Sequence, residues 1–520
     1  MLQVYNTLSR TKEPFKPVNE GKVGIYLCGP TVYKPSHIGH MVGPVIFDTI
    51  SKYFTYLGYD VTFVVNITDV DDKLIAESQR RGIPMSAVAE EMTADYFTNL
   101  KTMGVDSIKY FPRATEHMDG IIKFTQGLID KGYAYESKGD VYFNVAKFEG
   151  YGKLSNRTLE QMSGEGGGTA DRKESDFDFA LWKSAKPGEP SWESPWGPGR
   201  PGWHIECSVM SCALLGETFD IHGGGLDLQF PHHENEIAQS EALHDKPMAK
   251  YWMHNGLMQA SNEVGKVGGR KTRAAESGAK EGDLASQEAG KISKSKGASA
   301  FRDLVARIPA ETIRFFLLSS HYRRPIDYSE ERLAEVGKGL ESFYRLFKRF
   351  KLVTGQSFYA LAAPKTRAEG DARWSAVPAE KKLLTEAVAC RAKFLDAMDD
   401  DFNTAGGMGT LFDMTRLLNR AIEEKKLETT GSDADKAELV EAMTVLKELA
   451  QILGIFREEQ AEPAAADDGL TDALMKILIE LRLAAKKRKD FETADKIRDD
   501  LKAVGIVLED RPGETTWSRS

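Results

Sequence analysis

Val23-Gly24-Ile25-Tyr26-Leu27-Cys28-Gly29-Pro30 is followed closely by His37-Ile38-Gly39-His40. The first five of these residues are an apolar run typical of a short buried strand. Apolar residues then recur at helical spacing from about His40 to Tyr56, and Val61-Thr62-Phe63-Val64-Val65 is rich in β-branched residues. Because a strand, a helix and a strand in this order form a βαβ unit, the sequence predicts an N-terminal α/β domain with a doubly wound parallel sheet.

The whole chain has the composition of a soluble protein with several domains. It has 520 residues, of which 41% are hydrophobic and 28% are charged. The net charge of −9 argues against a general nucleic-acid coat protein but leaves room for a local basic stripe that binds RNA. The sequence contains neither a long apolar run nor a signal peptide at its start, so we expect no membrane span and a cytoplasmic location.

The four cysteines are too few and too scattered for a disulfide framework. Metal binding or catalysis in a reducing cytoplasm is the better interpretation. We expect Cys212 and Cys390 to be packed, buried residues with no chemical role.

Changes in composition along the chain predict its domains. An α/β domain should occupy residues 1–300, with a module inserted at about 115–200. Residues 260–290 are rich in Gly, Ala, Ser, Lys and Glu, which is typical of a surface loop or a disordered insert. The pattern is helical from residue 301 onward, and a small unit with a helix and a hairpin should form residues 469–520.

Two short motifs contain residues suited to binding phosphate. His37 and His40 are three residues apart near a predicted helix start, where imidazoles can donate hydrogen bonds to a triphosphate, and Gly39 leaves room for a base. The later run Lys291-Ile-Ser-Lys-Ser295 places two lysines between glycines. We expect Lys294 to contact phosphate in the transition state, assisted by Lys291. Taken separately, the two motifs could equally be a capped helix and a solvated basic loop.

A glycine run also suggests close approach of the backbone to a ligand. In His222-Gly223-Gly224-Gly225-Leu226-Asp227, Gly224 would let the main chain lie against a nucleotide, and Asp227 could accept from ribose hydroxyls. Glycine turns are common, so this motif is weak by itself.

Four further residues are candidate metal ligands. His232 and Glu236 are spaced i and i+4, so they share one face of a predicted helix. With the thiolates of Cys28 and Cys207 they form an S₂NO set suited to tetrahedral Zn²⁺. The alternative is that both cysteines are simply packed in the core.

The C-terminal region has a local basic helix although the protein is acidic. Lys486-Lys-Arg-Lys489 lies near Arg482, Lys496 and Arg498, and Trp517 follows as a platform for stacking. Basic residues beside an aromatic ring suit unpaired RNA bases. A solvated helix face is the alternative.

His37-Ile-Gly-His40 together with the later K-x-S-K-S is typical of class I aminoacyl-tRNA synthetases. Over nearly its whole length the chain resembles the cysteinyl-tRNA synthetase family. The resemblance rests on Cys28-Gly-Pro-Thr-Val-Tyr33, Asn66-Ile-Thr-Asp-Val-Asp-Asp72, Asp178-Phe-Ala-Leu-Trp-Lys183, Gly202-Trp-His-Ile-Glu-Cys207, His222-Gly-Gly-Gly-Leu-Asp227, Pro231-His-His-Glu-Asn-Glu236 and Asp400-Asp-Phe-Asn-Thr404.

This resemblance implies a Rossmann-like catalytic domain with a connective insertion. A stem-contact helical domain (301–372), an all-α anticodon-binding bundle (373–460) and a small α+β anticodon-recognition unit (469–520) would follow. The implied reaction joins L-cysteine to tRNA-Cys, using ATP with Mg²⁺ and one Zn²⁺ per chain. We expect a monomer.

The resemblance also assigns roles to individual residues. Cys28, Cys207, His232 and Glu236 would hold zinc, which binds a thiol in preference to a hydroxyl and could reject serine by roughly 10⁴-fold without an editing domain. The other implied residues are Gly29, Thr68 and Trp203 for cysteine, Gly39, Gly224, Asp227 and Lys294 for ATP, and Lys486, Asp495, Arg498, Asp510 and Trp517 for the GCA anticodon.

The chain departs from the family pattern at several positions. Between Gly256 and Lys291 lie 34 residues, more than is usual, and we hypothesise that this insert is mostly disordered and dispensable. Ile292, Lys296 and Lys486 stand where Met, Leu and Arg are usual.

Three other functions remain possible at this stage. A related ligase could join cysteine to a small amine, a zinc hydrolase could use His232 and Glu236, and a non-catalytic paralogue could only bind tRNA. The presence of both phosphate motifs, all four candidate ligands and the C-terminal units favours the synthetase.

Overall fold

The computed structural model describes residues 1–157, 172–260, 300–459, 470–511 and 514–519. Within these ranges the chain divides into two compact units, Met1–Arg457 and Glu458–Ser520. Lys291, Lys294, the predicted insert beyond residue 260 and the Pro512-Gly513 turn lie outside the described residues.

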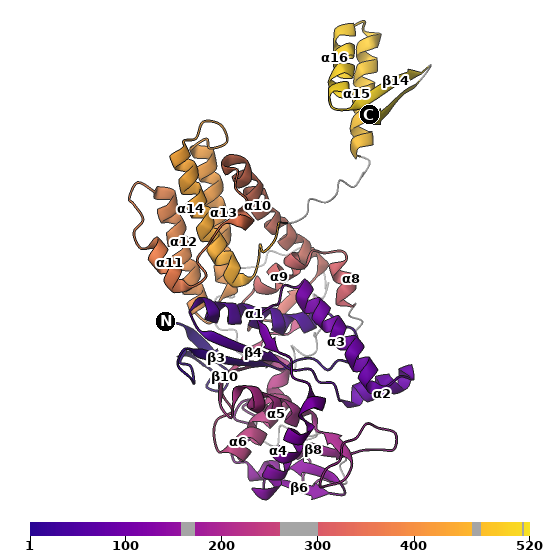
Figure 1. Ribbon diagram of the computed structural model, residues 1–520, viewed down its shortest axis with the longest axis vertical. Helices are drawn as coiled ribbons and strands as arrows, with labels where there is room; N and C mark the ends of the chain where they lie inside the picture. Colours follow the sequence, from indigo (N-terminus) through magenta and orange to yellow (C-terminus); the bar gives the residue numbers. More distant parts are fainter. Residues whose placement is uncertain (158–171, 261–299, 460–469, 512–513, 520) are drawn as a thin grey trace, which may run out of the picture. The chain divides into compact units, whose positions relative to one another are not determined.

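A five-stranded parallel sheet forms the centre of the first unit (Figure 1). Its strand order is β11-β10-β3-β4-β5, and every neighbouring pair is parallel. The strands are β3 (Lys22–Leu27), β4 (Asp60–Val65), β5 (Ile108–Tyr110), β10 (Phe219–Gly225) and β11 (Ala249–Asn255). The predicted βαβ unit is confirmed, with α1 (Gly39–Tyr56) connecting β3 to β4.

The strand order reverses between β3 and β10. Strands β4 and β5 follow β3 on one side, whereas β10 and β11, which come later in the chain, lie on the other side. In open α/β sheets, ligands bind at the carboxyl ends of the strands at such a switch point. Cys28 directly follows β3, and the run His222–Gly225 ends β10, so the topology brings these two motifs to one place.

Helices cover both faces of the sheet. Figure 1 shows α1 on one side and α5 and α6 on the other. On the α1 side the contact with β10 is close, because a Cβ at Gly223 would lie 2.3 Å from the Phe47 ring. The helices of this part are α2 (Asp72–Arg81), α3 (Met85–Thr102), α4 (Met118–Asp130), α5 (Trp203–Leu215) and α6 (Glu234–His244).

A second, antiparallel sheet forms where the inserted module was predicted. Its order is β6-β7-β8-β9, and a β1–β2 hairpin and a β12–β13 pair complete the strands of the first unit. Their bounds are β6 (Ala134–Ser137), β7 (Asp140–Phe143), β8 (Phe179–Ser184), β9 (Gly199–Pro201), β1 (Gln3–Asn6), β2 (Thr11–Pro14), β12 (Met258–Ala260) and β13 (Ile326–Tyr328).

The described chain from residue 300 to the end of the first unit is almost entirely helical. Its helices are α8 (Phe301–Val305), α9 (Ala310–Leu318), α10 (Glu330–Thr354), α11 (Arg367–Trp374), α12 (Lys382–Asp399), α13 (Thr404–Glu424) and α14 (Asp433–Leu453). Sequence signals set several of their ends. The Ser432 side chain accepts from the Asp435 amide at the start of α14, and Gly454 ends this helix with a φ of 66°.

The far end of α1 is anchored in this helical bundle. The Tyr53 hydroxyl donates to Asp399 Oδ1 over 2.6 Å, and the Tyr56 hydroxyl donates to Glu448 Oε1 over 2.6 Å. Arg391 Nε donates to the same Glu448 oxygen over 2.8 Å. All five side chains are buried, so polar bonds with little access to water join the helix that begins at the His37–His40 motif to α12 and α14.

A buried ion pair joins α1 to α9. Arg314 Nη2 lies 2.5 Å from Asp48 Oδ2, and the same guanidinium donates to the carbonyl oxygens of Met103 and Leu453. Burial opposes ionisation of Asp48, but Arg314 and Lys52 outweigh it and lower the pKa of this carboxyl to about 2.

The second unit is a helical pair followed by a hairpin. It contains α15 (Leu470–Lys487), α16 (Phe491–Ala503), β14 (Ile506–Arg511) and β15 (Glu514–Arg519). The two strands pair antiparallel, with Leu508 opposite Trp517, so the predicted hairpin is confirmed.

Replacing Arg314 with methionine should lower the free energy of unfolding by about 3 kcal/mol or more, because Asp48 would keep a buried charge without its main partner. The loss of unfolding free energy relative to wild type should be largest above about pH 4. It should shrink as the pH falls toward 2, since the folded-state pKa of Asp48 is depressed. Urea unfolding at several pH values measures this effect.

Arg302→Met is the matched control. Arg302 and its neighbour Asp303 are exposed, with side-chain accessibilities of 70% and 62%, so this change should cost less than about 0.5 kcal/mol. Equal losses of unfolding free energy in the Arg314 and Arg302 variants would contradict the stabilising role of the buried Arg314–Asp48 pair.

Candidate functional site

A cluster of side chains that could hold a metal lies at the switch point of the sheet, and all but the half-buried Cys28 are buried. Cys28 follows β3, and its amide donates to the Gly223 carbonyl of β10 over 3.1 Å. Cys207 comes from α5 on the other face of the sheet. His232 lies in a short helical turn directly before α6, and Glu236 is in the first turn of α6. Four separate elements therefore meet at one point.

The donor atoms are close enough to share one ion. Cys28 Sγ lies 3.8 Å from Cys207 Sγ and 3.5 Å from Glu236 Oε1. His232 Nε2 lies 3.0 Å from the same Glu236 oxygen. One ligand atom from each of the four residues falls within 4.8 Å of the others, so the four predicted ligands are brought together.

A second set of four donors overlaps the first. It keeps Cys28 and Glu236 and replaces Cys207 and His232 with His222 and His233. His222 Nε2 lies 2.7 Å from Glu236 Oε2, so both oxygens of this carboxylate have histidine partners. His222 and His233 were not predicted as metal ligands. The one signal for His222 is its position directly before the glycines at the end of β10, which is at the switch point.

Other aromatic residues pack closely around this cluster. The Trp203 ring stacks on His232 with 4.1 Å between centroids, and His204 Nδ1 lies 2.8 Å from His232 Nδ1. His233 Nδ1 in turn lies 2.8 Å from His254 Nε2. No sequence spacing could have identified these contacts, because His204, His232 and His254 come from different elements.

Burial destabilises the charged forms of these side chains when no cation is bound. It raises the pKa of the Cys28 thiol, which Cys207 and Glu236 raise further, and it also raises the pKa of Cys207. Burial lowers the pKa of His232 well below its usual range. A bound dication would reverse these penalties by stabilising thiolates and a neutral imidazole. Two sulfurs, one imidazole nitrogen and one carboxylate are the donors that Zn²⁺ favours, so these residues fit that ion.

The first phosphate motif lies at the start of α1. We expected the whole His37–His40 motif to lie in the first turn of the helix. The helix instead begins at Gly39, so His37 and Ile38 precede it. The His37 and His40 rings stack with centroids 3.9 Å apart, and His37 Nδ1 accepts from the Gly39 amide over 3.1 Å. The two imidazoles therefore face one place beside a helix N-terminus.

The glycine run is extended and does not form a turn. His222 to Gly225 continue β10, and this strand pairs with β11 as far as Gly225 opposite Asn255. Only Leu226 and Asp227 lie beyond the strand, in a short helical turn. Position 224 needs a glycine, because a Cβ at Gly224 would lie 2.6 Å from the His233 ring.

The residues expected to bind cysteine lie around the metal-ligand cluster. The Gly29 amide donates to Asn66 Oδ1 over 2.8 Å, and Asn66 Nδ2 donates to the Thr68 hydroxyl over 3.3 Å. Thr68 is buried, whereas Trp203 is 38% exposed while it stacks on the metal-ligand candidate His232. Gly29 and Thr68 are thus joined by one hydrogen-bond chain next to Cys28.

In the second unit, Asp510 is the centre of a polar network. Arg482 donates to both of its oxygens over 2.7 and 2.9 Å, and Lys486 donates over 2.8 Å. These bonds hold the pKa of Asp510 well below its usual range. Arg498 pairs with Asp495 over 3.2 Å. Four of the five predicted anticodon residues, Lys486, Asp495, Arg498 and Asp510, therefore have partners in the protein itself.

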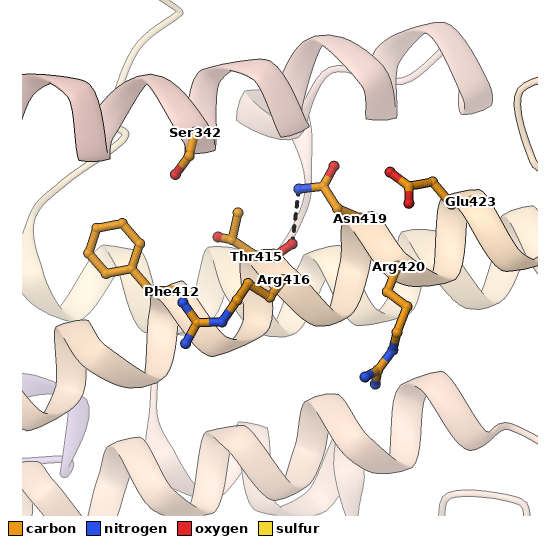
Figure 2. Close-up of a pocket in the computed structure, with 7 residues that line it drawn as sticks. All are labelled: Ser342, Phe412, Thr415, Arg416, Asn419, Arg420 and Glu423. Atoms are coloured by element: carbon orange, nitrogen blue, oxygen red, sulfur yellow. Dashed lines mark hydrogen bonds between the residues drawn. The ribbon is translucent and has the colours of Figure 1, made fainter.

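A separate pocket lies between α10 and α13 (Figure 2), with a volume of about 400 Å³. The lining residues are Ser342, Phe412, Thr415, Arg416, Asn419, Arg420 and Glu423. Its two arginines already pair with Asp413 and Glu386. None of the predicted site residues lines this pocket.

Three parts of the chain match models of known protein families. The chain matches the family model described as tRNA synthetases class I (C) catalytic domain over residues 14–267. It also matches the DALR domain over residues 393–457 and the Cysteinyl-tRNA ligase anticodon binding domain over residues 467–517.

Relatives match the chain over nearly their full length. The Cysteine--tRNA ligase of Geobacter metallireducens is 44% identical, and the match covers 99% of each chain. The chain belongs to the cysteine–tRNA ligase family. The family member of Geobacillus thermodenitrificans is 43% identical, with 100% of this chain and 99% of that one covered.

Solved structures of other synthetases support the fold of this family member. Methionyl-tRNA synthetase of Mycobacterium tuberculosis, bound by methionyl-adenylate, superimposes with a TM-score of 0.56 at 14% identity. The match covers 83% of this chain and 90% of that one, so it supports the fold alone. Among the described residues, no helix is both long enough and apolar enough to cross a membrane.

Gly29→Ala should destabilise the protein by about 1–3 kcal/mol, the usual cost of overpacking, and should weaken amino-acid binding. The added Cβ would lie 1.8 Å from the Asn66 carbonyl oxygen, and the backbone there is held by the bond from the Ile67 amide to the Pro112 carbonyl. Thermal unfolding measures the first effect.

Gly409→Ala in α13 is the control, because nothing lies within 4 Å of the Cβ that it would add. It should stabilise the protein by about 0.5–1 kcal/mol through its higher helix propensity. A melting temperature of Gly29→Ala at or above that of wild type would refute the close approach at Gly29.

Proposed function

We propose that this chain activates L-cysteine with ATP and transfers it to tRNA-Cys. The observation that carries the proposal is the cluster of Cys28, Cys207, His232 and Glu236 at the switch point of the sheet, in a chain that also stacks His37 on His40 at the start of α1. The first site can recognise a thiol and the second can bind phosphate. Full-length similarity to cysteine–tRNA ligases supports the same activity.

The metal site would select the amino acid. Cys28, Cys207, His232 and Glu236 would hold Zn²⁺, which when bound supplies a soft Lewis acid that favours a thiol over a hydroxyl. The chain's own residues orient the rest of the substrate. Gly29, Thr68 and Trp203 would form the walls around the amino acid. Hydrogen bonds with Asn66 hold Gly29 and Thr68 in position, and stacking on His232 holds Trp203.

The nucleotide would bind across the carboxyl ends of the strands. His37 and His40 would donate to the triphosphate of ATP, which enters with Mg²⁺, while Gly39 leaves room for the base. Gly224 would lie against the nucleotide, and Asp227 would accept from ribose hydroxyls. Lys291 and Lys294 would supply positive charge as the pyrophosphate leaves.

The chemistry needs no side-chain nucleophile. A cysteine carboxylate oxygen attacks the α-phosphorus of ATP and pyrophosphate leaves, which gives cysteinyl-adenylate. A hydroxyl of the 3′-terminal adenosine of tRNA-Cys then attacks the adenylate carbonyl, and AMP leaves. Positioning and electrostatic stabilisation would supply the rate enhancement.

Recognition of tRNA would involve the later domains. We assign residues 1–300 to catalysis, 301–372 to stem contact, 373–460 to an anticodon-binding bundle and 469–520 to reading the GCA anticodon. Lys486, Asp495, Arg498, Asp510 and Trp517 would contact the anticodon. We further propose a cytoplasmic monomer.

A ligase that joins cysteine to a small amine is the second candidate. It would use the same catalytic core and metal site. The match of residues 467–517 to an anticodon binding domain argues against this second candidate, because joining cysteine to a small amine does not involve tRNA.

The test is acylation of a tRNA-Cys transcript with labelled cysteine or serine, in the presence of ATP and Mg²⁺. We expect cysteinyl-tRNA and no seryl-tRNA. Cysteine-dependent ATP–pyrophosphate exchange without any acylated tRNA would leave activation standing and overturn the proposed acceptor.

Cys207→Ser should weaken zinc retention by at least about tenfold, because a ligand would be lost. Competition with a chromophoric chelator measures this directly, without relying on activity. Cys212→Ser is the control, since Cys212 is half-buried on the same helix and contacts His244 over 3.7 Å instead of the cluster. Equal zinc retention by wild type and Cys207→Ser would remove Cys207 from the ligand set.

A further inference from the structure

The ammonium groups of two lysines lie over one half-buried tyrosine ring beside the proposed active site. Lys34 Nζ lies 5.7 Å from the centroid of the Tyr33 ring, and Lys73 Nζ lies 5.8 Å from the same centroid. Both distances are within the range of cation–π attraction. Tyr33 packs against the hydrophobic core but stays partly exposed, and both lysines are exposed. None of these three residues, the Tyr33–lysine cluster, has a role in the proposed mechanism.

The loops that follow β3 and β4 build the Tyr33–lysine cluster. Tyr33 lies in the loop that runs from Cys28 of the metal-ligand cluster to His37 of the phosphate motif. A parallel β-bridge joins this loop to Thr68 in the loop after β4. Helix α2 begins shortly afterwards and has Lys73 in its first turn. The Tyr33–lysine cluster therefore lies at the carboxyl edge of the sheet, where α/β folds bind their ligands.

The acidic residues beside Lys73 have other partners. Asp72 pairs with Arg200 and also with Lys183, the latter over 3.1 Å. The Asp71 carboxylate caps α2 by accepting from the Lys73 amide over 2.8 Å. Among the residues that the structure describes, no carboxylate pairs with the Lys73 ammonium. Its positive charge is therefore available to an anion that reaches the Tyr33 ring.

An aromatic ring beside lysine ammonium groups suits an unpaired nucleotide. A base can stack on the ring, and an ammonium group is a compact charge that binds phosphate. Proteins recognise unpaired RNA chiefly through such stacking together with contacts to the backbone. The proposed reaction includes two ligands of this chemistry, namely ATP and the unpaired 3′ end of tRNA-Cys.

The strand order favours the tRNA. Gly224 and Asp227, which we assign to ATP, lie at the end of β10, whereas Tyr33 and Lys73 follow β3 and β4. Strands β10 and β4 lie on opposite sides of β3 in the sheet. ATP would thus have its contacts on the β10 side, and the Tyr33–lysine cluster lies on the β4 side. The 3′-terminal adenosine must approach the adenylate by a path of its own, and this side of the sheet offers one.

We propose that Tyr33 and Lys73, assisted by Lys34, bind an unpaired nucleotide at the 3′ end of tRNA-Cys. Its base stacks on the Tyr33 ring, and its phosphate contacts the ammonium groups. The inference rests on the proposed function and deepens it, because it assigns a binding site to the acceptor end of the RNA.

The experiment compares two transcripts that differ only at the 3′ end. One is the complete tRNA-Cys transcript, and the other lacks its unpaired 3′-terminal nucleotides. Their dissociation constants are measured by filter binding for wild type, Tyr33→Leu, Tyr33→Phe and Lys73→Met. The KM values for ATP and L-cysteine in ATP–pyrophosphate exchange and the melting temperature are recorded for each protein.

In Tyr33→Leu we expect the dissociation constant of the complete transcript to rise at least about fivefold, because base stacking is lost. The dissociation constant of the shortened transcript should change less than about twofold. Tyr33→Phe keeps an aromatic ring and should bind both transcripts as wild type does. The KM values for ATP and L-cysteine should stay within about twofold of wild type in both variants.

Lys73→Met should weaken binding of the complete transcript through a lost phosphate contact. The slope of the logarithm of affinity against the logarithm of salt concentration should become shallower by roughly 0.7, the value for one phosphate on a single strand. With the shortened transcript the slopes of variant and wild type should agree. Because Lys73 is exposed, this variant should melt as wild type does, and it decides the question if Tyr33→Leu is unstable.

Lys109 and Tyr110 provide the matched control. The Lys109 ammonium lies 5.7 Å from the centroid of the Tyr110 ring, and both residues are exposed. They lie on β5, the outermost strand of the sheet beyond β4. Lys109→Met and Tyr110→Leu should leave both dissociation constants unchanged.

The outcomes separate this inference from the proposed function. Equal losses of affinity for the two transcripts would overturn the contact with the 3′ end, as would unchanged affinity for the complete transcript. A raised KM for ATP with unchanged binding of tRNA would assign the Tyr33–lysine cluster to ATP and overturn the inference as well. If wild type itself fails to bind tRNA-Cys, the proposed function falls first.

Discussion

The phenols of Tyr53 and Tyr56 donate to buried carboxylates of the helical bundle, and these bonds fix the far end of α1. The near end of the same helix carries His40 of the phosphate motif. Between the two ends, Phe47 packs where Gly223 leaves no side chain, and Asp48 pairs with Arg314. One rigid helix therefore sets the position of the phosphate motif relative to both the sheet and the bundle.

The second constraint is electrostatic. The sheet brings Cys28 and His222 to its switch point, and α5 and α6 add Cys207, His232 and Glu236. Burying so many ionisable groups destabilises a fold unless a cation compensates for their lost hydration. The cluster is thus one that a bound cation would stabilise, and it lies where the topology already favours ligand binding. The proposed recognition of a thiol would use the same donors whose burial costs free energy.

Much of the fold could be predicted because the decisive signals were local. The run Val23–Leu27, the helical spacing after His40 and the second strand at Val61–Val65 have distinct periods, and the structure follows them closely. The i and i+4 spacing of His232 and Glu236 likewise placed two donors on one side, although His232 lies just before the helix. The expected role of each of these donors remains a prediction.

Long-range contacts could not be predicted from the sequence. The contacts of His222 with Glu236 and of His233 with His254 join residues from different elements, so no periodicity indicates them. The extent of β10 was also misjudged, because three glycines suggest a turn, whereas pairing with β11 keeps them extended. Register between strands depends on partners far away in the chain, and a single sequence does not contain that information locally.

The most direct test of the account is a titration of the cobalt-substituted protein with L-cysteine and, separately, with L-serine. Co²⁺ occupies zinc sites and reports each bound sulfur through a sulfur-to-cobalt charge-transfer band in the near ultraviolet. The account predicts that this band intensifies as cysteine binds and stays unchanged with serine. An unchanged band with both amino acids, under conditions where cysteine is activated, would contradict selection of the substrate through its thiol at this cluster.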